Sequence, residues 1–140
     1  MVQPPGIPFR EFRQRIELVT LQSGASCNKG DVLIGTSTGY VQATQSLAGS
    51  DAYNYCIALA AVVGVSGVQA TVRAMFEGAV GVNKLNNTVV NYGQALGVST
   101  SAGQVDVMSV ANLYGAHYQV GWAMEAAISG NTSVGLFITE

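Results

Sequence analysis

The stretch GDVLIGTSTGYVQAT (residues 30–44) carries the pattern that decides the fold of this chain. A turn ends at Gly30-Asp31, and the apolar run VLIG that follows has the length and composition of a short strand. TSTG is a small polar turn, and in YVQAT apolar and polar residues alternate as in a half-buried strand. We therefore expect a β-hairpin here, with the Asp31 side chain serving the turn.

A second stretch, GQALGVSTSAGQVDV (93–107), repeats this order of glycine, strand, Ser/Thr-rich turn and strand. Further along, CIALAAVVGVSGVQATV (56–72) aligns with GWAMEAAISGNTSVGLFI (121–138). The offsets, from 30 to 93 and from 56 to 121, are 63 and 65 residues. Similar offsets in series favour a duplicated β-unit of about 64 residues. Chance similarity between Gly- and Val-rich strands is the alternative.

The composition fits one mostly-β domain, a small β-barrel or β-sandwich. The 140 residues include 17 glycines, and 49% of them are hydrophobic. Only 10% are charged, whereas about 25% is typical of globular proteins. So few charges suit a subunit that covers its surface with copies of itself or with a larger partner.

Charge and hydropathy argue against several classes of partner. A net charge of -2 and a pI near 5.2 lack the basic footprint that nucleic acid requires. The longest apolar stretch, CIALAAVVGV (56–65), is too short to span a bilayer, and the N-terminus does not resemble a signal peptide. Cys27 and Cys56 have no metal-site spacing. They could pair if they lie close in space, but without a signal peptide we expect reduced thiols.

The N-terminal stretch MVQPPGIPFREFRQRIELVT (1–20) differs from the rest of the chain. Its prolines predict an extended segment, and the alternation over 12–21 favours a strand over an amphipathic helix. We divide the chain into an extended N-terminal arm (1–17) and a β-rich domain (18–140). The arm would add a strand to a neighbour's sheet and offer arginines to carboxylates; a frayed terminus is the alternative. The residues expected to bind a neighbour are Pro4, Pro5, Pro8, Phe9, Arg10, Phe12, Arg13 and Arg15.

The remainder of the chain predicts a loop over 47–55 and short β-runs after it, broken by Gly64, Gly67, Gly78 and Gly81. Tyrosine and tryptophan are over-represented at protein interfaces. We therefore take Tyr53, Tyr55 and Trp122 as candidates for a subunit interface.

No catalytic, cofactor or metal site emerges from the sequence, so we expect a protein that is not an enzyme. His117 has no nucleophile or carboxylate beside it in the sequence, and the carboxylates are scattered singly. A domain that carries a cofactor on Lys84, in an expected turn over 81–87, or on Lys29 is one alternative, but the Met-Lys-Met tip of such domains is absent. A small β-barrel enzyme using His117 with a carboxylate or Cys27 is another. Glu125 is expected to face solvent or an interface.

Four segments in order, GDVLIGTSTGYVQAT, IALAAVVGVSGVQATVRAMFEGAVGV, NYGQALGVSTSAGQV and VGWAMEAAISGNTSVGLFI, resemble the capsid decoration proteins of tailed bacteriophages, the DUF2190 or decoration-protein-like family. The resemblance covers roughly residues 28–138. It implies a β-rich cement protein, made in the host cytoplasm. As a homotrimer it would bind the major capsid protein on the outer surface of the virion. Pro4-Pro5 and the nearby arginines are not part of the family pattern. A phage tail or baseplate β-module is the competing interpretation.

Overall fold

The computed structural model describes residues 4–7, 13–48, 54–85, 87–108 and 118–139. These residues form mainly β-strands, which confirms the predicted mostly-β fold class. The elements are β1 (Arg15–Thr20), β2 (Val32–Thr36), β3 (Gly39–Gln42), α1 (Gln45–Ala48), β4 (Tyr55–Ala58), β5 (Thr71–Asn83), β6 (Ala95–Val98), β7 (Val105–Val107), β8 (Gln119–Ala123) and β9 (Ser133–Ile138).

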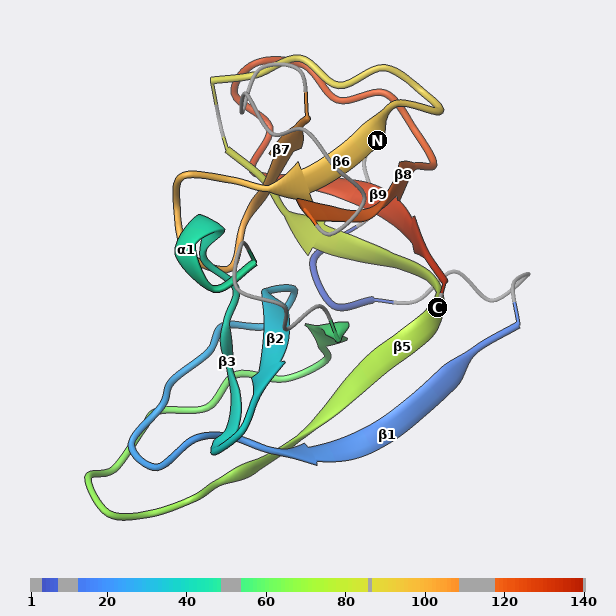
Figure 1. Cartoon of the computed structure of the whole chain (residues 1–140). Helices are drawn as coiled ribbons and strands as arrows, with labels where there is room; N and C mark the ends of the chain where they lie inside the picture. The colour runs from blue at the N-terminus through green and yellow to red at the C-terminus, as the bar shows by residue number, and fades with distance from the viewer. Residues whose placement is uncertain (1–3, 8–12, 49–53, 86, 109–117, 140) are drawn as a thin grey trace.

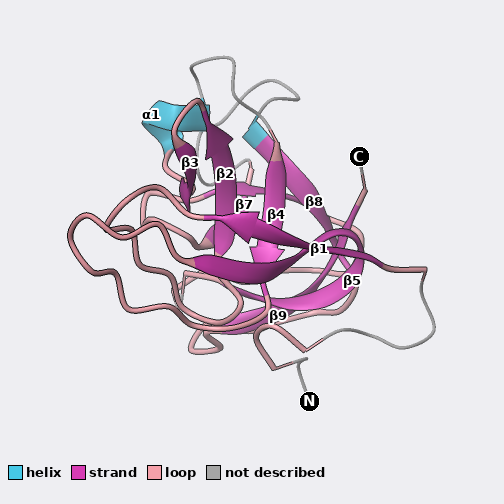
Figure 2. Cartoon of the chain, turned by 90° about the horizontal axis from the view of Figure 1, so that it is seen from below, coloured by secondary structure: helices cyan, strands magenta, loops and turns pink. Residues whose placement is uncertain are grey.

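The strands pair antiparallel in one curled sheet with the order β3-β2-β4-β5-β9-β8-β6-β7, and β1 pairs with β5 outside this path. In Figure 1 the long strand β5 runs between two groups of strands, with β1 along one half of it and β9 along the other. Figure 2 shows the sheet from below, with α1 at one end. This order divides into two halves of four strands, β3-β2-β4-β5 and β9-β8-β6-β7, which meet between β5 and β9. Equivalent strands occur in opposite order in the two halves.

The chain consists of two structurally equivalent repeats, as the sequence offsets suggest. The first repeat comprises β1 to β4 and the first half of β5; the second comprises the second half of β5 and β6 to β9. Equivalent cross-strand pairs keep the same register: Ile16–Met75 and Ala79–Phe137, Val32–Ile57 and Ala95–Trp122, Leu18–Arg73 and Gly81–Gly135. The last strand of one repeat therefore continues directly into the first strand of the next.

Main-chain hydrogen bonds outside the strands repeat as well. Three bonds of the first repeat have these counterparts in the second: Gly30 N to Ala58 O with Gly93 N to Ala123 O, Cys27 N to Val62 O with Val90 N to Ala127 O, and Leu21 N to Ala70 O with Lys84 N to Thr132 O. The pair Gly35–Tyr40 corresponds to Val98–Val105, whose hairpin loop is two residues longer. That longer loop explains why the sequence offset rises from 63 to 65.

The first repeat is buried on both faces of its sheet. Alternate residues of a strand point to opposite faces. Val32, Ile34, Ile57 and Met75 belong to the larger hydrophobic cluster, which also contains the core of the second repeat. Their sequence neighbours Leu33, Cys56, Ala74 and Phe76 belong to a smaller cluster confined to the first repeat. The two repeats therefore pack on each other through one face of the first.

Three local expectations need correction. The strand β5 is continuous through Gly78 and Gly81, because partners on β1 and β9 pair with its main chain along its length. Within the expected loop over 47–55, Leu47 and Ala48 belong to α1, whose first turn is capped by Thr44 Oγ1 accepting from Leu47 N at 3.2 Å, and Tyr55 begins β4. The expected arm boundary at residue 17 lies inside β1, which pairs with β5 of the same chain.

Candidate functional site

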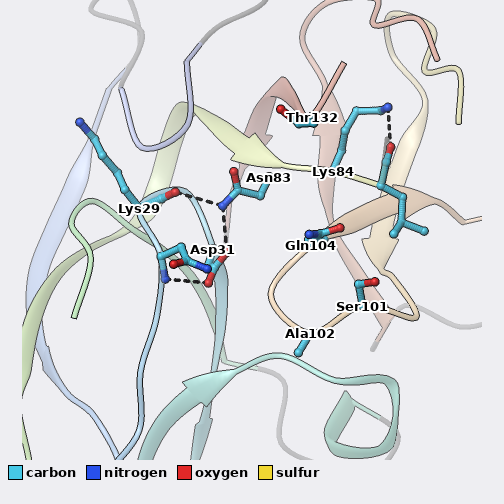
Figure 3. Close-up of a pocket in the computed structure, with 10 residues that line it drawn as sticks. Lys29, Asp31, Asn83, Lys84, Ser101, Ala102, Gln104 and Thr132 are labelled. Atoms are coloured by element: carbon cyan, nitrogen blue, oxygen red, sulfur yellow. Dashed lines mark hydrogen bonds between the residues drawn. The ribbon is translucent and has the colours of Figure 1, made fainter. Parts of the chain in front are cut away.

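A polar cavity of about 520 Å³ lies where the two repeats meet (Figure 3). Its walls come from the turn before β2, the end of β5, the β6–β7 loop and the turn before β9. The lining residues are Asn28, Lys29, Asp31, Asn83, Lys84, Leu85, Ser101, Ala102, Gln104 and Thr132.

Asp31 is the acidic group of this cavity, and it is only 2% exposed. Its Oδ2 accepts from Asn28 N at 2.8 Å, as expected for a turn-forming aspartate, and from Gln42 Nε2 at 2.6 Å. Its Oδ1 accepts from Asn83 Nδ2 at 2.8 Å. Because Asn83 belongs to the first strand of the second repeat, the carboxylate ties the two repeats together. The side chain of its counterpart in the second repeat, Gln94, keeps the turn bond, with Oε1 accepting from Asn91 N at 2.7 Å.

Lys84 is the basic group of the cavity, and it is 1% exposed. It occupies the position that Leu21, fully buried, holds in the first repeat, since both residues make the same main-chain bonds and bridges. Its Nζ donates to Leu85 O at 2.5 Å and to Asn131 O at 2.9 Å. Burial lowers the pKa of Lys84, and the nearby Asp106 carboxylate opposes this shift. The second repeat thus has a lysine at a buried position where the first repeat has a leucine.

The charged groups that line the interior of this cavity are bonded to the chain itself. Asp31 has three donors and Lys84 Nζ has two acceptors. Within the described ranges, no group of three His, Cys, Asp or Glu side chains is placed to hold a metal ion. The cavity therefore acts as a polar seam between the repeats. The expected turn at Lys84 is wrong, because this residue directly follows β5, forms a bridge with Val105 and is buried.

The residues expected to bind a neighbour from the N-terminal arm fall into three groups. Pro4 and Pro5 lie against the chain's own β5, where Gly6 N donates to Gly81 O at 2.7 Å. Arg13 is exposed. Arg15 contacts its own chain: its Nε lies 3.2 Å from Glu17 Oε2 on β1, and its guanidinium lies 4.9 Å above the ring of Phe76 on β5. Pro8, Phe9, Arg10 and Phe12 lie outside the described residues.

The three aromatic residues expected at a subunit interface also differ in their surroundings. Tyr55 is 7% exposed and belongs to the larger hydrophobic cluster, so its side chain is not available to a partner subunit. The reason is that β4 begins at Tyr55 and turns this side chain inward. Trp122 on β8 is 44% exposed. Tyr53 lies outside the described residues.

Trp122 belongs to a cross-strand row that the sequence alone did not reveal. In the second repeat the row runs Ala95–Trp122–Phe137–Ala79 across β6, β8, β9 and β5. The equivalent row in the first repeat runs Val32–Ile57–Met75–Ile16, and its first three members are fully buried. In the second repeat, Trp122 is exposed and Ala95 and Phe137 are half-buried. The alignment of Ile57 with Trp122 in the sequence was the signal from which this row could have been predicted.

The remaining chemical candidates have no catalytic arrangement among the described residues. Cys27 and Cys56 are both free and buried, and burial raises the pKa of each thiol. A raised pKa makes a thiol a poorer nucleophile at neutral pH. Glu125 is half-buried, with Oε1 accepting from Gly135 N at 3.3 Å. His117 lies outside the described residues.

Within the ranges that the structure describes, no helix has the length and apolar character to cross a membrane. Comparisons with protein-family models, curated proteins and solved structures find no match to this chain, so its function has to be argued from its own residues.

Proposed function

We propose that this chain is a structural protein of a viral capsid, a decoration or cement protein that binds the outer surface of the shell as a homotrimer. It would add contacts across the seams between copies of the major capsid protein. Its role would be mechanical, because many weak and repeated contacts strengthen a lattice through multivalency. The proposal requires no catalysis, cofactor, nucleic acid or membrane.

The observation that carries the proposal is the exposed row of the second repeat. Trp122 is 44% exposed on a sheet face whose equivalent in the first repeat is buried by the other repeat. A large aromatic side chain on an exposed sheet face is typical of the centre of a protein interface. The low fraction of charged residues, 10%, points in the same direction. Self-association through this face is therefore the part of the proposal with the most direct support.

The order of four sequence segments that resemble phage decoration proteins supports the shell as the larger partner. In addition, the cavity between the repeats holds an aspartate and a lysine whose hydrogen bonds all go to the chain itself. Such a seam contributes to a rigid body rather than to a site that turns over substrate. A rigid body with an apolar face suits a cement protein.

The test is co-sedimentation of the purified protein with expanded, undecorated capsids of the virus that encodes it. Wild type, Trp122→Ser and the matched control Val63→Ser would be compared, since Val63 is 87% exposed and lies outside the row. We expect saturable binding at a multiple of three copies per lattice site. We also expect Trp122→Ser, but not Val63→Ser, to lower the mass of the free protein to that of a monomer and to weaken capsid binding. Absence of wild-type binding to expanded shells would reject the proposal and favour a tail or baseplate component.

A further inference from the structure

We propose that copies of this chain associate head to tail, with the tip of the β2–β3 hairpin of one copy bound between Ala95 and Met108 of the next. The contact repeats, between copies, the one that joins the two repeats within the chain. The inference rests on the proposed function only for self-association through the Trp122 face, and it names the surface of the second copy that meets this face.

The contact within the chain is made by the β6–β7 loop, which in Figure 1 extends from β6 toward α1. Val32 N donates to Gly103 O at 2.8 Å, and Gly103 N donates to Ala43 O at 3.0 Å. Gly103 thus takes up one donor of the first repeat and one acceptor. At this contact Val32 and Ala43 are fully buried, and so is Ile57, the cross-strand partner of Val32.

The second repeat has the same donor and acceptor without a partner. In the first repeat, Ala43 N donates to Val32 O at 2.9 Å. The counterpart of this bond runs from Met108 N to Ala95 O at 3.3 Å. Among the residues that the structure describes, Ala95 N and Met108 O have no main-chain partner. The second repeat therefore offers the two groups that Gly103 takes up in the first.

These two groups are also accessible. Ala123 N donates to Gln94 O at 2.9 Å, and residues of an antiparallel pair alternate between facing the partner strand and facing away. The N–H of Ala95 therefore points away from β8, toward the end of β7. Ala95 and Met108 are half-buried and Trp122 is 44% exposed, whereas their three counterparts in the first repeat are fully buried. The site is thus continuous with the exposed row.

The repeat pattern assigns the β2–β3 hairpin of a second copy to this site, because that hairpin is the counterpart of the β6–β7 loop. Its tip residue Ser37 is exposed, and among the described residues neither its N–H nor its C=O has a partner. Ser37 therefore presents the same two groups as Gly103. The adjacent Thr38 is held by two side chains, with Gln22 Nε2 donating to its Oγ1 and Gln69 Nε2 donating to its carbonyl oxygen at 3.3 Å. A tip that is held in place loses little conformational entropy on binding.

The β2–β3 loop is two residues shorter than the β6–β7 loop, and this difference is compatible with a contact between copies. Within the chain, β5 fixes the distance that the β6–β7 loop has to span, whereas two copies approach each other without such a tether. In Figure 1 the hairpin belongs to the lower group of strands, and β6 and β7 belong to the upper group. The contact is therefore heterologous, and such contacts form a ring when the rotation between copies closes. A homotrimer requires a ring of this kind.

The test is crosslinking between two single-cysteine variants of the full chain, Ser37→Cys and Met108→Cys, with a short bismaleimide. We expect a two-chain product on a denaturing gel from their mixture and none from either variant alone, because the contact joins two different surfaces. The matched control replaces Ser37→Cys by Ser129→Cys, at an exposed serine between β8 and β9, and should give no product. Wild type, whose Cys27 and Cys56 are buried, gives the background.

The double variant Ser37→Cys/Met108→Cys tests whether the ring closes. We expect a covalent product of three chains and none longer, because a ring of three copies uses every hairpin and every site. A ladder of products longer than three chains would overturn the ring.

A further substitution tests the main-chain donor itself. Ala95→Pro removes an N–H that bonds no described main-chain group of its own chain, and proline is tolerated at the first residue of a strand. This variant should weaken self-association at least tenfold in sedimentation velocity, whereas Ala95→Ser, which keeps the N–H, should associate like wild type. Equal association of the two variants would overturn the inference.

Failure of this inference is distinguishable from failure of the proposed function. If Trp122→Ser lowers the mass of the free protein but the mixture of Ser37→Cys and Met108→Cys gives no more product than the control, self-association stands and the assigned surface of the second copy is wrong. If wild type is a monomer at every concentration, both self-association and this contact are wrong.

Discussion

At the scale of single residues, Leu21 and Lys84 show how two equivalent positions diverge. Both follow the first strand of a repeat and both are buried, but Leu21 packs in the smaller hydrophobic cluster while Lys84 lines the polar cavity. The ammonium group of Lys84 exchanges water for two main-chain carbonyls, of Leu85 and Asn131. Desolvation disfavours the charged form, and this is why the pKa of Lys84 is lowered.

A lowered lysine pKa predicts that stability rises with pH. The folded chain binds the Lys84 proton more weakly than the unfolded chain does. The resulting loss of unfolding free energy is therefore complete at pH values below the pKa that Lys84 has in the folded chain. As the pH rises from the folded pKa toward the ordinary lysine value of about 10.4, this penalty disappears. The unfolding free energy of wild type relative to Lys84→Met should therefore increase over that window, by about 1.4 kcal/mol for each unit by which the pKa is lowered.

Urea unfolding of both proteins at several pH values from neutral up to about 10.4 follows this rise and measures the difference. Leu21→Met is the matched control, because it changes the equivalent position of the other repeat without involving a titratable group. The difference between wild type and Leu21→Met should not vary with pH. A difference between wild type and Lys84→Met that stays constant, or falls, as the pH rises would contradict the assigned burial of the ammonium group.

At the scale of elements, β5 determines how the two repeats are joined. It ends the first repeat and begins the second without a turn, and the register of β1 against it shifts between Arg15 and Ile16. Gly78 lies beside this irregularity with φ of +133°. A Cβ at this position would lie 3.0 Å from Met75 Sδ and 3.1 Å from Arg13 O. The junction therefore needs a residue without a side chain.

Gly78→Ala should destabilise the chain by about 2–3 kcal/mol, from backbone strain together with the close approach to Arg13 O. The control is Gly67→Ala, since Gly67 also has positive φ but a Cβ added there would have no atom within 4 Å. This control should cost only the strain, about 1 kcal/mol. Thermal unfolding of both variants separates the two contributions. Equal losses of stability would show that the packing around Gly78 is unimportant.

The elements also show what the sequence could and could not predict. The turn residues Asn28 and Gly30 recur as Asn91 and Gly93, so the offset between the hairpins was visible. In contrast, RIELVT of β1 and GAVGVN of β5 share only a valine at equivalent positions, Val19 and Val82. The equivalence of these strands appears only in their pairing registers. Because the sequence did not show that this part of β5 is equivalent to β1, the burial of Lys84, which follows it, could not be predicted either.

At the scale of the whole molecule, the two repeats have similar main chains but different environments. The first repeat lies between the smaller cluster on one face and the second repeat on the other. Within the ranges that the structure describes, the second repeat packs on the first through one face, and Trp122 on its other face is 44% exposed. Among the described residues, this duplication therefore leaves one face of the second repeat uncovered. Under the proposed function, a further protein surface would cover it.

This asymmetry predicts opposite consequences for two equivalent substitutions. Ile57 and Trp122 occupy the same position in the two rows, and Ile57 is fully buried whereas Trp122 is 44% exposed. Ile57→Ala removes core volume and should cost about 2–5 kcal/mol of unfolding free energy in the monomer. Trp122→Ala should cost less than Ile57→Ala in the monomer, because 44% of Trp122 is exposed to solvent there whereas Ile57 is fully buried.

Urea unfolding at low protein concentration measures the monomer, and the same experiment at high concentration measures the assembled state. If the Trp122 row is covered by another copy, the loss of stability caused by Trp122→Ala should grow as concentration rises, whereas the loss caused by Ile57→Ala should stay the same. A large loss from Trp122→Ala at every concentration would place this tryptophan in the chain's own core. Its exposed face could then not be the surface that the second repeat leaves for a partner.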